Sequence, residues 1–340
     1  MKTGSFLLVF SLFVLQITAQ TETELSVKKA ADLMSANKPR EAIAIYNEVI
    51  KLFPVESADL YMYRGLAYQK LRSFDTAYAD FTNALKLDPN YEKAYVARGQ
   101  IFSVYGLYKK AEVEYEKAKK LDPTDVLIYN DLGYNCTLQG LHAAAIELYD
   151  KCIELAPRYD TAYINKAISL SGLGKLDEAI KTLDILISFK PNYGIAHYER
   201  AGYYKEKGDN KKALEGYITA LKLNPEHSGM RVVLANFKYK LNDIKGAEED
   251  YRLAIKYDST YMPGYSSFAN FKIKTGRAEE ALTLIALAEK HDPKNVEILM
   301  VYGELLVNQN KREEACEIYK RAEKLGSGAA ISKRIINCSQ

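Results

Sequence analysis

The amino-acid sequence predicts an all-α solenoid, in which helix pairs follow one another with a period of 34 residues. Three residue types recur in this one phase, and an internal repeat of this length decides the fold before any local feature does. The first set is Pro89, Pro123, Pro157, Pro191, Pro225 and Pro293. The second set is Gly106, Gly140, Gly174, Gly208, Asn242, Gly276 and Asn310. The third set is Ala77, Ala111, Ala145, Ala179, Ala213, Ala247, Ala281 and Ala315.

Length and composition agree with an array of repeats. The chain has 340 residues, which is long for one hydrophobic core but suits a series of small stacked units. Its hydrophobic content of 48% and charged content of 27% are typical of a folded chain rather than a disordered one. The net charge of +3 gives no electrostatic reason to expect a nucleic-acid partner, so we expect none.

The N-terminal segment differs from the rest. Met1 and Lys2 precede a ten-residue apolar run over residues 6–15, and "TAQ" follows before the first acidic residues. This pattern predicts a signal peptide over residues 1–19, with export to the periplasm or the medium. Its ending resembles signal peptides common in the Bacteroidetes, and no lipoprotein cysteine follows it. The alternative is a retained anchor, but the run is short for a bilayer span, and no other span is expected.

We number the residues of each repeat so that its proline falls at position 32. In this numbering frame one extra residue is present between the first two repeats, near Ser57. Apolar residues within a unit follow helical spacing on two helices. In the third unit Tyr95 and Phe102 lie on the first helix, and Ala111 and Ala118 on the second. Nine units fit, beginning at residues 23, 58, 92, 126, 160, 194, 228, 262 and 296.

Each repeated position has a physical cause. Glycine or asparagine at position 15 can take the left-handed conformation that ends the first helix. Proline at position 32 lacks a backbone donor and ends the second helix. Small residues at positions 8 and 20 are expected where two helix backbones approach closely. Aromatic residues at positions 4 and 24 are expected to fill the space between helices, which accounts for most of the 27 tyrosines.

This pattern resembles the tetratricopeptide repeat family over residues 23–329, with tyrosine in place of the family's usual tryptophan. Unit seven departs most, with Arg231 at position 4 and Ser259 at position 32. The resemblance implies a right-handed superhelix whose first helices line a concave groove and whose second helices form the convex back. After Gly326 and Gly328 we expect a C-terminal capping helix over residues 330–340, which keeps the end of a solenoid soluble.

The four cysteines predict one disulfide and no metal site. Cys316 lies on the last second helix and Cys338 on the cap that folds back over it, so an oxidising compartment favours a bridge between them; two separate core thiols are the alternative. Cys136 and Cys152 are expected to be buried free thiols. No C-x-x-C pair or histidine cluster is present, so we expect no metal and no cofactor.

Nothing in the sequence indicates catalysis. The histidines at 142, 197, 227 and 291 occupy different units and unrelated positions, and His197 takes the place of a packing aromatic at position 4. No nucleophile lies at a helical or turn spacing from a base. The sequence therefore indicates a chain that is not an enzyme.

The resemblance implies that the groove meets partner polypeptides through positions 2, 5, 6, 9, 12 and 13. Asparagine can bind a peptide backbone through its donors and its acceptor, and tyrosine suits an interface. Asparagine and tyrosine at these positions do not follow the residue pattern of the core, so we expect the core not to require them. The alternative is that these side chains are merely exposed to solvent. The residues expected to bind a partner are Asn130, Tyr134, Asn165, Ile168, Tyr198, Asn236, Tyr239 and Asn270.

A variant of the family clamps acidic chaperone tails with lysine at position 5 and asparagine at position 9. Here position 9 has Asn236 and Asn270, but position 5 has Val232 and Ser266, so that clamp is not expected. We expect a non-catalytic scaffold of the cell envelope that binds an extended segment or helix of another protein. The alternative is a structural accessory subunit of a secretion, outer-membrane assembly or polysaccharide export complex at the membrane.

Overall fold

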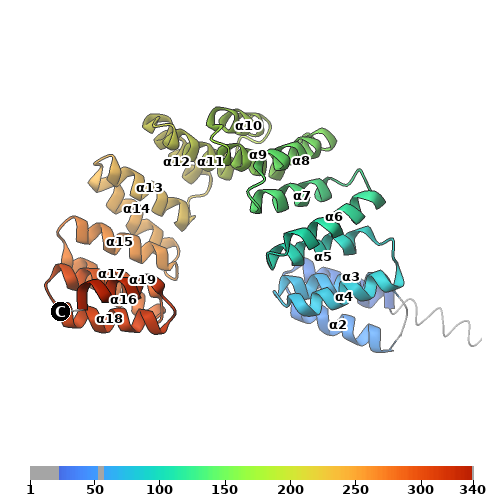
Figure 1. The fold of residues 1–340 in the computed structure, drawn as a ribbon, viewed down its shortest axis with the longest axis horizontal. Coiled ribbons are helices and arrows are strands. Elements are labelled where there is room, and N and C mark those ends of the chain that lie inside the picture. Colours follow the sequence, from blue (N-terminus) through green and yellow to red (C-terminus); the bar gives the residue numbers. More distant parts are fainter. Residues whose placement is uncertain (1–22, 53–56, 339–340) are drawn as a thin grey trace, which may run out of the picture. The chain divides into compact units, whose positions relative to one another are not determined.

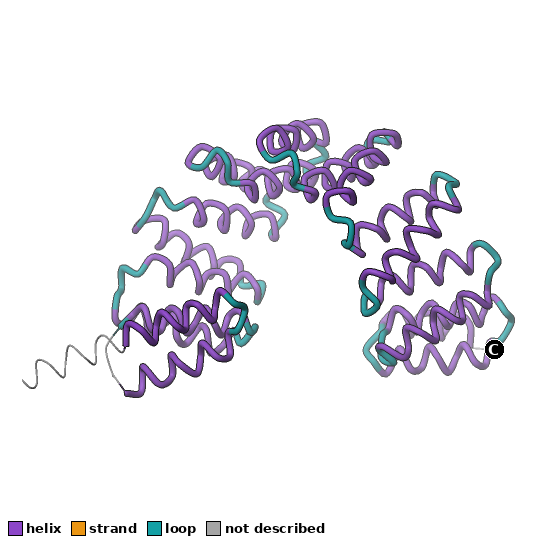
Figure 2. The backbone as a smooth tube through the Cα atoms, turned by 180° about the vertical axis from the view of Figure 1, so that it is seen from behind, coloured by secondary structure: helices purple, strands orange, loops and turns teal. Residues whose placement is uncertain are grey.

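Within residues 23–52 and 57–338, which the computed structural model describes, every regular element is a helix (Figures 1 and 2). The predicted signal peptide lies outside these residues. The fold is an all-α repeat solenoid, as predicted. The helices fall into two compact units, divided between Leu173 and Gly174.

The N-terminal unit begins with a helix over residues 23–35. It continues with α2 (Pro39–Leu52), α3 (Ala58–Lys70), α4 (Phe74–Leu87), α5 (Glu92–Val104), α6 (Tyr108–Leu121), α7 (Val126–Leu138), α8 (His142–Leu155) and α9 (Asp160–Gly172). The C-terminal unit contains α10 (Leu176–Phe189), α11 (Gly194–Glu206), α12 (Asn210–Leu223), α13 (Ser228–Lys240), α14 (Ile244–Tyr257), α15 (Met262–Lys274), α16 (Ala278–His291), α17 (Val296–Asn308), α18 (Arg312–Lys324) and α19 (Gly328–Cys338).

From Ala58 in α3 to Val296 in α17, the first helices begin at position 1 of the repeat frame. Within each of the two compact units a helix packs mainly on the helices before and after it in the chain. Helix α7, the first helix of its repeat, also contacts α5 and α9, the first helices of the adjacent repeats. This neighbour-on-neighbour packing is the arrangement of a stacked repeat. None of the described helices is both long and apolar enough to cross a membrane.

The turn between the two helices of a 34-residue repeat has the predicted left-handed residue at position 15 of that repeat. Gly106 has φ 71° and Asn242 has φ 65°. Arg72 takes the same conformation with φ 60°, although it has neither the freedom of glycine nor the short polar side chain of asparagine. The sequence pattern did not predict a left-handed arginine in the second unit.

The reason for the small residue at position 8 differs from the prediction. A Cβ added at Gly133 would lie 2.6 Å from a ring carbon of Tyr149, so the aromatic ring at position 24, not a neighbouring backbone, fills this space. Gly65, Gly99 and Gly303 face their own aromatic ring in the same way.

Position 4 makes a repeated hydrogen bond that the sequence analysis did not predict. The Tyr129 hydroxyl donates to the carbonyl of Pro123, six residues upstream, at 2.9 Å. At the same position His197 Nε2 lies 2.8 Å from the Pro191 carbonyl, and Arg231 Nε donates to the Pro225 carbonyl at 3.0 Å. The contact to the proline carbonyl is therefore kept where position 4 is not tyrosine.

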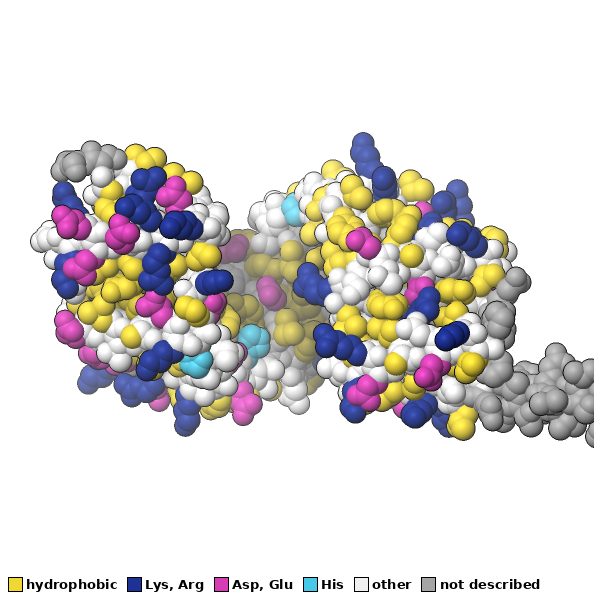
Figure 3. Space-filling model, turned by 90° about the horizontal axis from the view of Figure 1, so that it is seen from below, with side chains coloured by type: hydrophobic (Ala, Val, Ile, Leu, Met, Phe, Trp, Pro, Cys, Tyr) yellow, Lys and Arg dark blue, Asp and Glu magenta, His cyan; other side chains and the backbone are white. Residues whose placement is uncertain are grey.

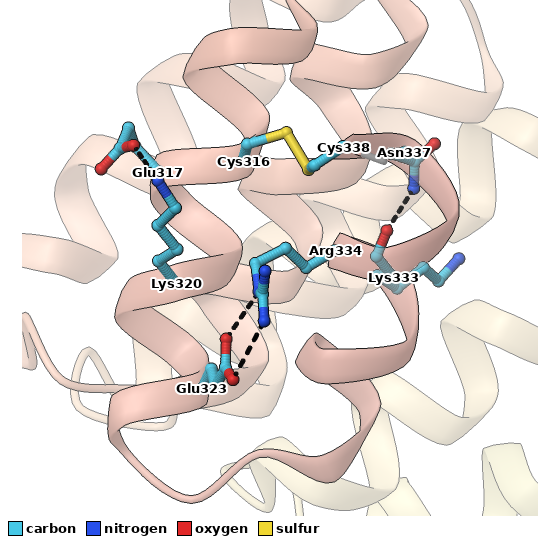
Figure 4. Close-up of a disulfide and its surroundings, with 8 residues drawn as sticks. All are labelled: Cys316, Glu317, Lys320, Glu323, Lys333, Arg334, Asn337 and Cys338. Atoms are coloured by element: carbon cyan, nitrogen blue, oxygen red, sulfur yellow. Dashed lines mark hydrogen bonds and ion pairs between the residues drawn. A yellow bond between two sulfur atoms is a disulfide. The ribbon is translucent and has the colours of Figure 1, made fainter. Parts of the chain in front are cut away.

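The C-terminal cap begins at Gly328, two residues before the predicted start. The Cys316–Cys338 disulfide is present, with a Cα–Cα distance of 6.0 Å (Figure 4). Arg334 Nε on the cap also donates to Glu323 of α18 at 2.7 Å. Covalent and polar contacts together hold α19 on α18.

The other two cysteines are free thiols, as predicted, but they differ in burial. Cys152 is fully buried, and this burial raises its pKa to about 12, so the thiolate is suppressed. Cys136 is only half-buried, so it is less buried than the sequence led us to expect.

Candidate functional site

The surface made by the first helices α3, α5, α7 and α9 exposes a group of large apolar side chains. Positions 2, 6, 9 and 13 of a helix lie on one face, since they are separated by three or four residues. Val104 is 55% and Tyr134 48% exposed at these positions. We call the group the apolar stripe: Tyr63, Leu66, Val104, Leu127, Tyr134, Leu138 and Ile168.

The C-terminal unit lacks an equivalent stripe in the described residues. At the same positions of α11, α13, α15 and α17, Ile195 is the large apolar side chain that is exposed. Figure 3 shows hydrophobic side chains between charged ones on the unit that adjoins the grey N-terminal residues, and some on the other unit as well. Exposed apolar area on a folded surface marks sites of interaction, so the N-terminal unit is the better candidate.

A chain of hydrogen bonds crosses the same four helices, and we call it the amide ladder. Gln69 Nε2 donates to Gln100 Oε1 at 3.0 Å, and Gln100 Nε2 donates to Asp131 Oδ2 at 2.7 Å. From the other side Asn165 Nδ2 donates to Asn130 Oδ1 at 3.1 Å, and Asn130 Nδ2 donates to Asp131 Oδ1 at 3.3 Å. Both arms of the ladder therefore end on the Asp131 carboxylate.

A hollow of about 480 Å³ lies beside the ladder and the stripe. Asp131, Gln100, Val104, Tyr134 and Leu138 are among the residues that line it. Burial raises the pKa of Asp131 above its usual value, while the hydrogen bonds from Gln100 and Asn130 oppose the shift because they stabilise the ionised form. The hollow thus combines apolar side chains with amide and hydroxyl groups and one acidic group.

The structure brings four of the predicted binding residues to this surface. Tyr134 and Ile168 belong to the apolar stripe, and Asn130 and Asn165 belong to the amide ladder. Asn130 is only 8% exposed, because its amide is used inside the ladder. The expectation that these positions are independent of the core is therefore wrong for Asn130.

The other four predicted residues lie in the C-terminal unit, and three of them make internal contacts. The ring of Tyr198 packs against that of Tyr217, with 5.5 Å between centroids, and Tyr239 packs edge-on to Phe271. Asn236 Oδ1 accepts a hydrogen bond from Tyr251 at 2.7 Å, although the residue remains exposed. Asn270 is half-buried.

Sequence reasoning missed several members of this surface. Gln69 and Gln100 were not among the predicted site residues, nor were Val104 and Leu138. Val104 and Leu138 both occupy position 13 of adjacent repeats, and this recurrence of apolar residues could have identified them from the sequence. Pairing of Gln69 with Gln100 requires knowledge of the side-chain conformations, which the sequence does not supply.

The C-terminal unit contains an ion network of a different kind. Lys272 is 2% exposed, and its Nζ lies 2.6 Å from Glu248 and 2.7 Å from Glu280. Hydrogen bonds from Arg277, followed by those from Lys272, lower the pKa of Glu248 to about 2. All four groups have opposite charges beside them, and the lowered pKa keeps Glu248 ionised as the partner of Lys272 and Arg277, as expected for a structural ion network.

Among the described residues, no group of three or more histidine, cysteine, aspartate or glutamate side chains could hold a metal ion.

Two solved structures share the fold. The type IV pilus biogenesis factor PilW has 20% identity and a TM-score of 0.53, and the match covers 60% of this chain and 94% of PilW. A tetratricopeptide repeat protein from Parabacteroides merdae has 18% identity and a TM-score of 0.53, with 72% and 96% covered.

A relative by sequence is the human DnaJ homolog subfamily C member 7, which is 42% identical over 64 residues, or 18% of this chain. The chain spans only 13% of the length of that protein. Models of the tetratricopeptide repeat match residues 58–91, 92–125, 126–159, 195–227 and 269–330. These matches cover more than half of the chain, which therefore belongs to the tetratricopeptide repeat family.

Proposed function

We propose that this chain is a protein-binding scaffold that holds a partner polypeptide on the first-helix surface of its N-terminal unit. The apolar stripe is the observation that carries the proposal. Its side chains remain exposed although the cores beneath them are filled by other residues of the repeat. Burying such side chains at an interface is favourable by roughly 25 cal/mol per Å² of apolar area.

The ladder and the stripe have different parts in this function. The ladder ties α3, α5, α7 and α9 together, so the surface is formed before the partner arrives and little ordering cost falls on this chain. The stripe supplies aromatic and aliphatic contact area, of the kind found at the centre of interfaces. An extended segment or a helix can lie along such a surface.

We also propose that the chain works in the cell envelope. The support is the signal-peptide pattern of residues 1–19, with its basic start, apolar run and small residue at the cleavage point. The disulfide between Cys316 and Cys338 agrees with an oxidising compartment.

The test is a cross-linking pull-down from envelope extract with three forms of the chain. The first is unchanged, and the second has Val104→Ser, Tyr134→Ser and Leu138→Ser. The third is a matched control with Val113→Ser and Leu121→Ser, which removes apolar side chains of similar exposure from α6, a second helix of the same unit. Exposed substitutions of this kind change stability by only about 0.5 kcal/mol, so all three forms should be equally helical.

We expect the unchanged chain and the control to capture the same partner, and the stripe variant to lose it. Equal capture by all three forms would show that the first-helix surface is not the binding site. Capture of a whole membrane complex that survives the stripe substitutions would favour a fixed structural subunit instead.

A further inference from the structure

We propose that Asp131 receives a lysine or arginine side chain of the partner, which enters the hollow between α5 and α7. This inference rests on the proposed function and adds the chemistry of the partner to it. A segment with a basic residue among apolar ones is the occupant that fits.

Asp131 lacks the cation that two other carboxylates of the N-terminal unit have. In the same unit the buried carboxylate of Asp80 pairs with Arg64 at 2.6 Å, and that of Glu114 pairs with Arg98. Asp131 is half-buried, yet no ion pair joins it to any residue of 23–52 or 57–338. A partly buried charge without a counter-ion is costly, and a cation from a partner would relieve that cost.

The hydrogen bonds to Asp131 leave room for a further donor on its carboxylate. Each oxygen of Asp131 accepts one amide hydrogen, Oδ2 from Gln100 and Oδ1 from Asn130. A carboxylate oxygen can accept more than one hydrogen bond, so each retains capacity for another donor. The amides orient the carboxylate but are neutral, so its charge is still uncompensated.

The wall of the hollow suits a long basic side chain. Val104, Tyr134 and Leu138 line it together with Asp131. Lysine and arginine carry an aliphatic stem below a charged head, so the stem can contact these apolar side chains while the head reaches the carboxylate. Hydrogen bonds between two charged groups are about twice as strong as neutral ones. An acidic segment would be repelled by the same carboxylate.

The experiment selects ligands for the full chain from a random peptide library displayed on phage. Affinities of the selected peptides are then measured by calorimetry, each beside a copy in which lysine is replaced by norleucine. Norleucine keeps the aliphatic stem and removes the charge. We expect lysine and arginine to be enriched, and the norleucine copy to bind the unchanged chain about tenfold more weakly.

Asp131→Asn should weaken the lysine peptide by a similar factor and leave the norleucine copy almost unchanged. The comparison of the two peptides on the unchanged chain needs no variant, so it holds even if Asp131→Asn disturbs the ladder. Peptides that need Tyr134 and Leu138 but tolerate norleucine and Asp131→Asn would overturn this inference and leave the proposed function standing. A library without binders, or binders indifferent to the apolar stripe, would overturn both.

Discussion

Replacing Gly133 with alanine tests the packing rule that the structure gives for position 8. A Cβ at this position would lie 2.6 Å from one ring carbon of Tyr149 and 2.9 Å from two others. The ring is fully buried, and its hydroxyl lies 3.0 Å from Thr137 Oγ1. It can move away only by disturbing its neighbours and this hydrogen bond.

Two effects of opposite sign decide the outcome. Alanine is a better helix former than glycine and would stabilise α7 by about 1 kcal/mol. Overpacking a filled core costs about 1–3 kcal/mol, and the hydrogen bond is worth about 1 kcal/mol. We therefore expect Gly133→Ala to lower the free energy of unfolding by about 2 kcal/mol.

Gly202 in α11 provides a matched control. A Cβ there would have only the Tyr217 hydroxyl near it, at 3.8 Å, so Gly202→Ala should stabilise by up to about 1 kcal/mol. A repeat array does not unfold in one step, so the assay is native-state hydrogen exchange of the helices that flank each site. The two variants should shift protection in opposite directions. Equal or greater protection in Gly133→Ala would refute the packing argument.

Three further predictions concern the cap, a turn and the ion network. Replacing Cys316 and Cys338, 22 residues apart, with serine should cost about 3 kcal/mol in the chain-entropy description, seen as faster hydrogen exchange in the cap; unchanged exchange there would contradict it. Arg72→Gly should slow hydrogen exchange in α3 and α4 by relieving a left-handed arginine that costs about 1 kcal/mol, and faster exchange there would show that the side-chain contacts of Arg72 matter more. Glu248→Gln should reduce stability by on the order of 1 kcal/mol, after allowance for screening at the partly exposed Arg277. The pKa of Glu248 is lowered from 4.5 to about 2, so the destabilisation by Glu248→Gln should have its full size above pH 4.5 and should vanish as the pH falls through 2, measured by hydrogen exchange of α14 to α16 across this range. A destabilisation independent of pH would exclude the ion pair as its cause.

The sequence by itself determined the period, the helix class and the ends of most helices. These features depend on local chemistry, such as the left-handed glycine at Gly106 or the missing donor at Pro123, repeated in phase along the chain. The same frame also placed Cys316 and Cys338 on elements that pack together, so their bridge could be predicted.

The tertiary structure alone decided which residues form the candidate surface. Gln100 and Asp131 are 31 residues apart, and their hydrogen bond depends on the side-chain conformations of neighbouring repeats. Asn130 and Tyr198 occupy positions that the frame marks as groove, yet one is buried in the ladder and the other packs on a ring. A repeat pattern specifies where a Cα lies relative to the next unit. It does not specify which side chains cover one another, or which charge has no partner, because both depend on the particular neighbours that packing brings together.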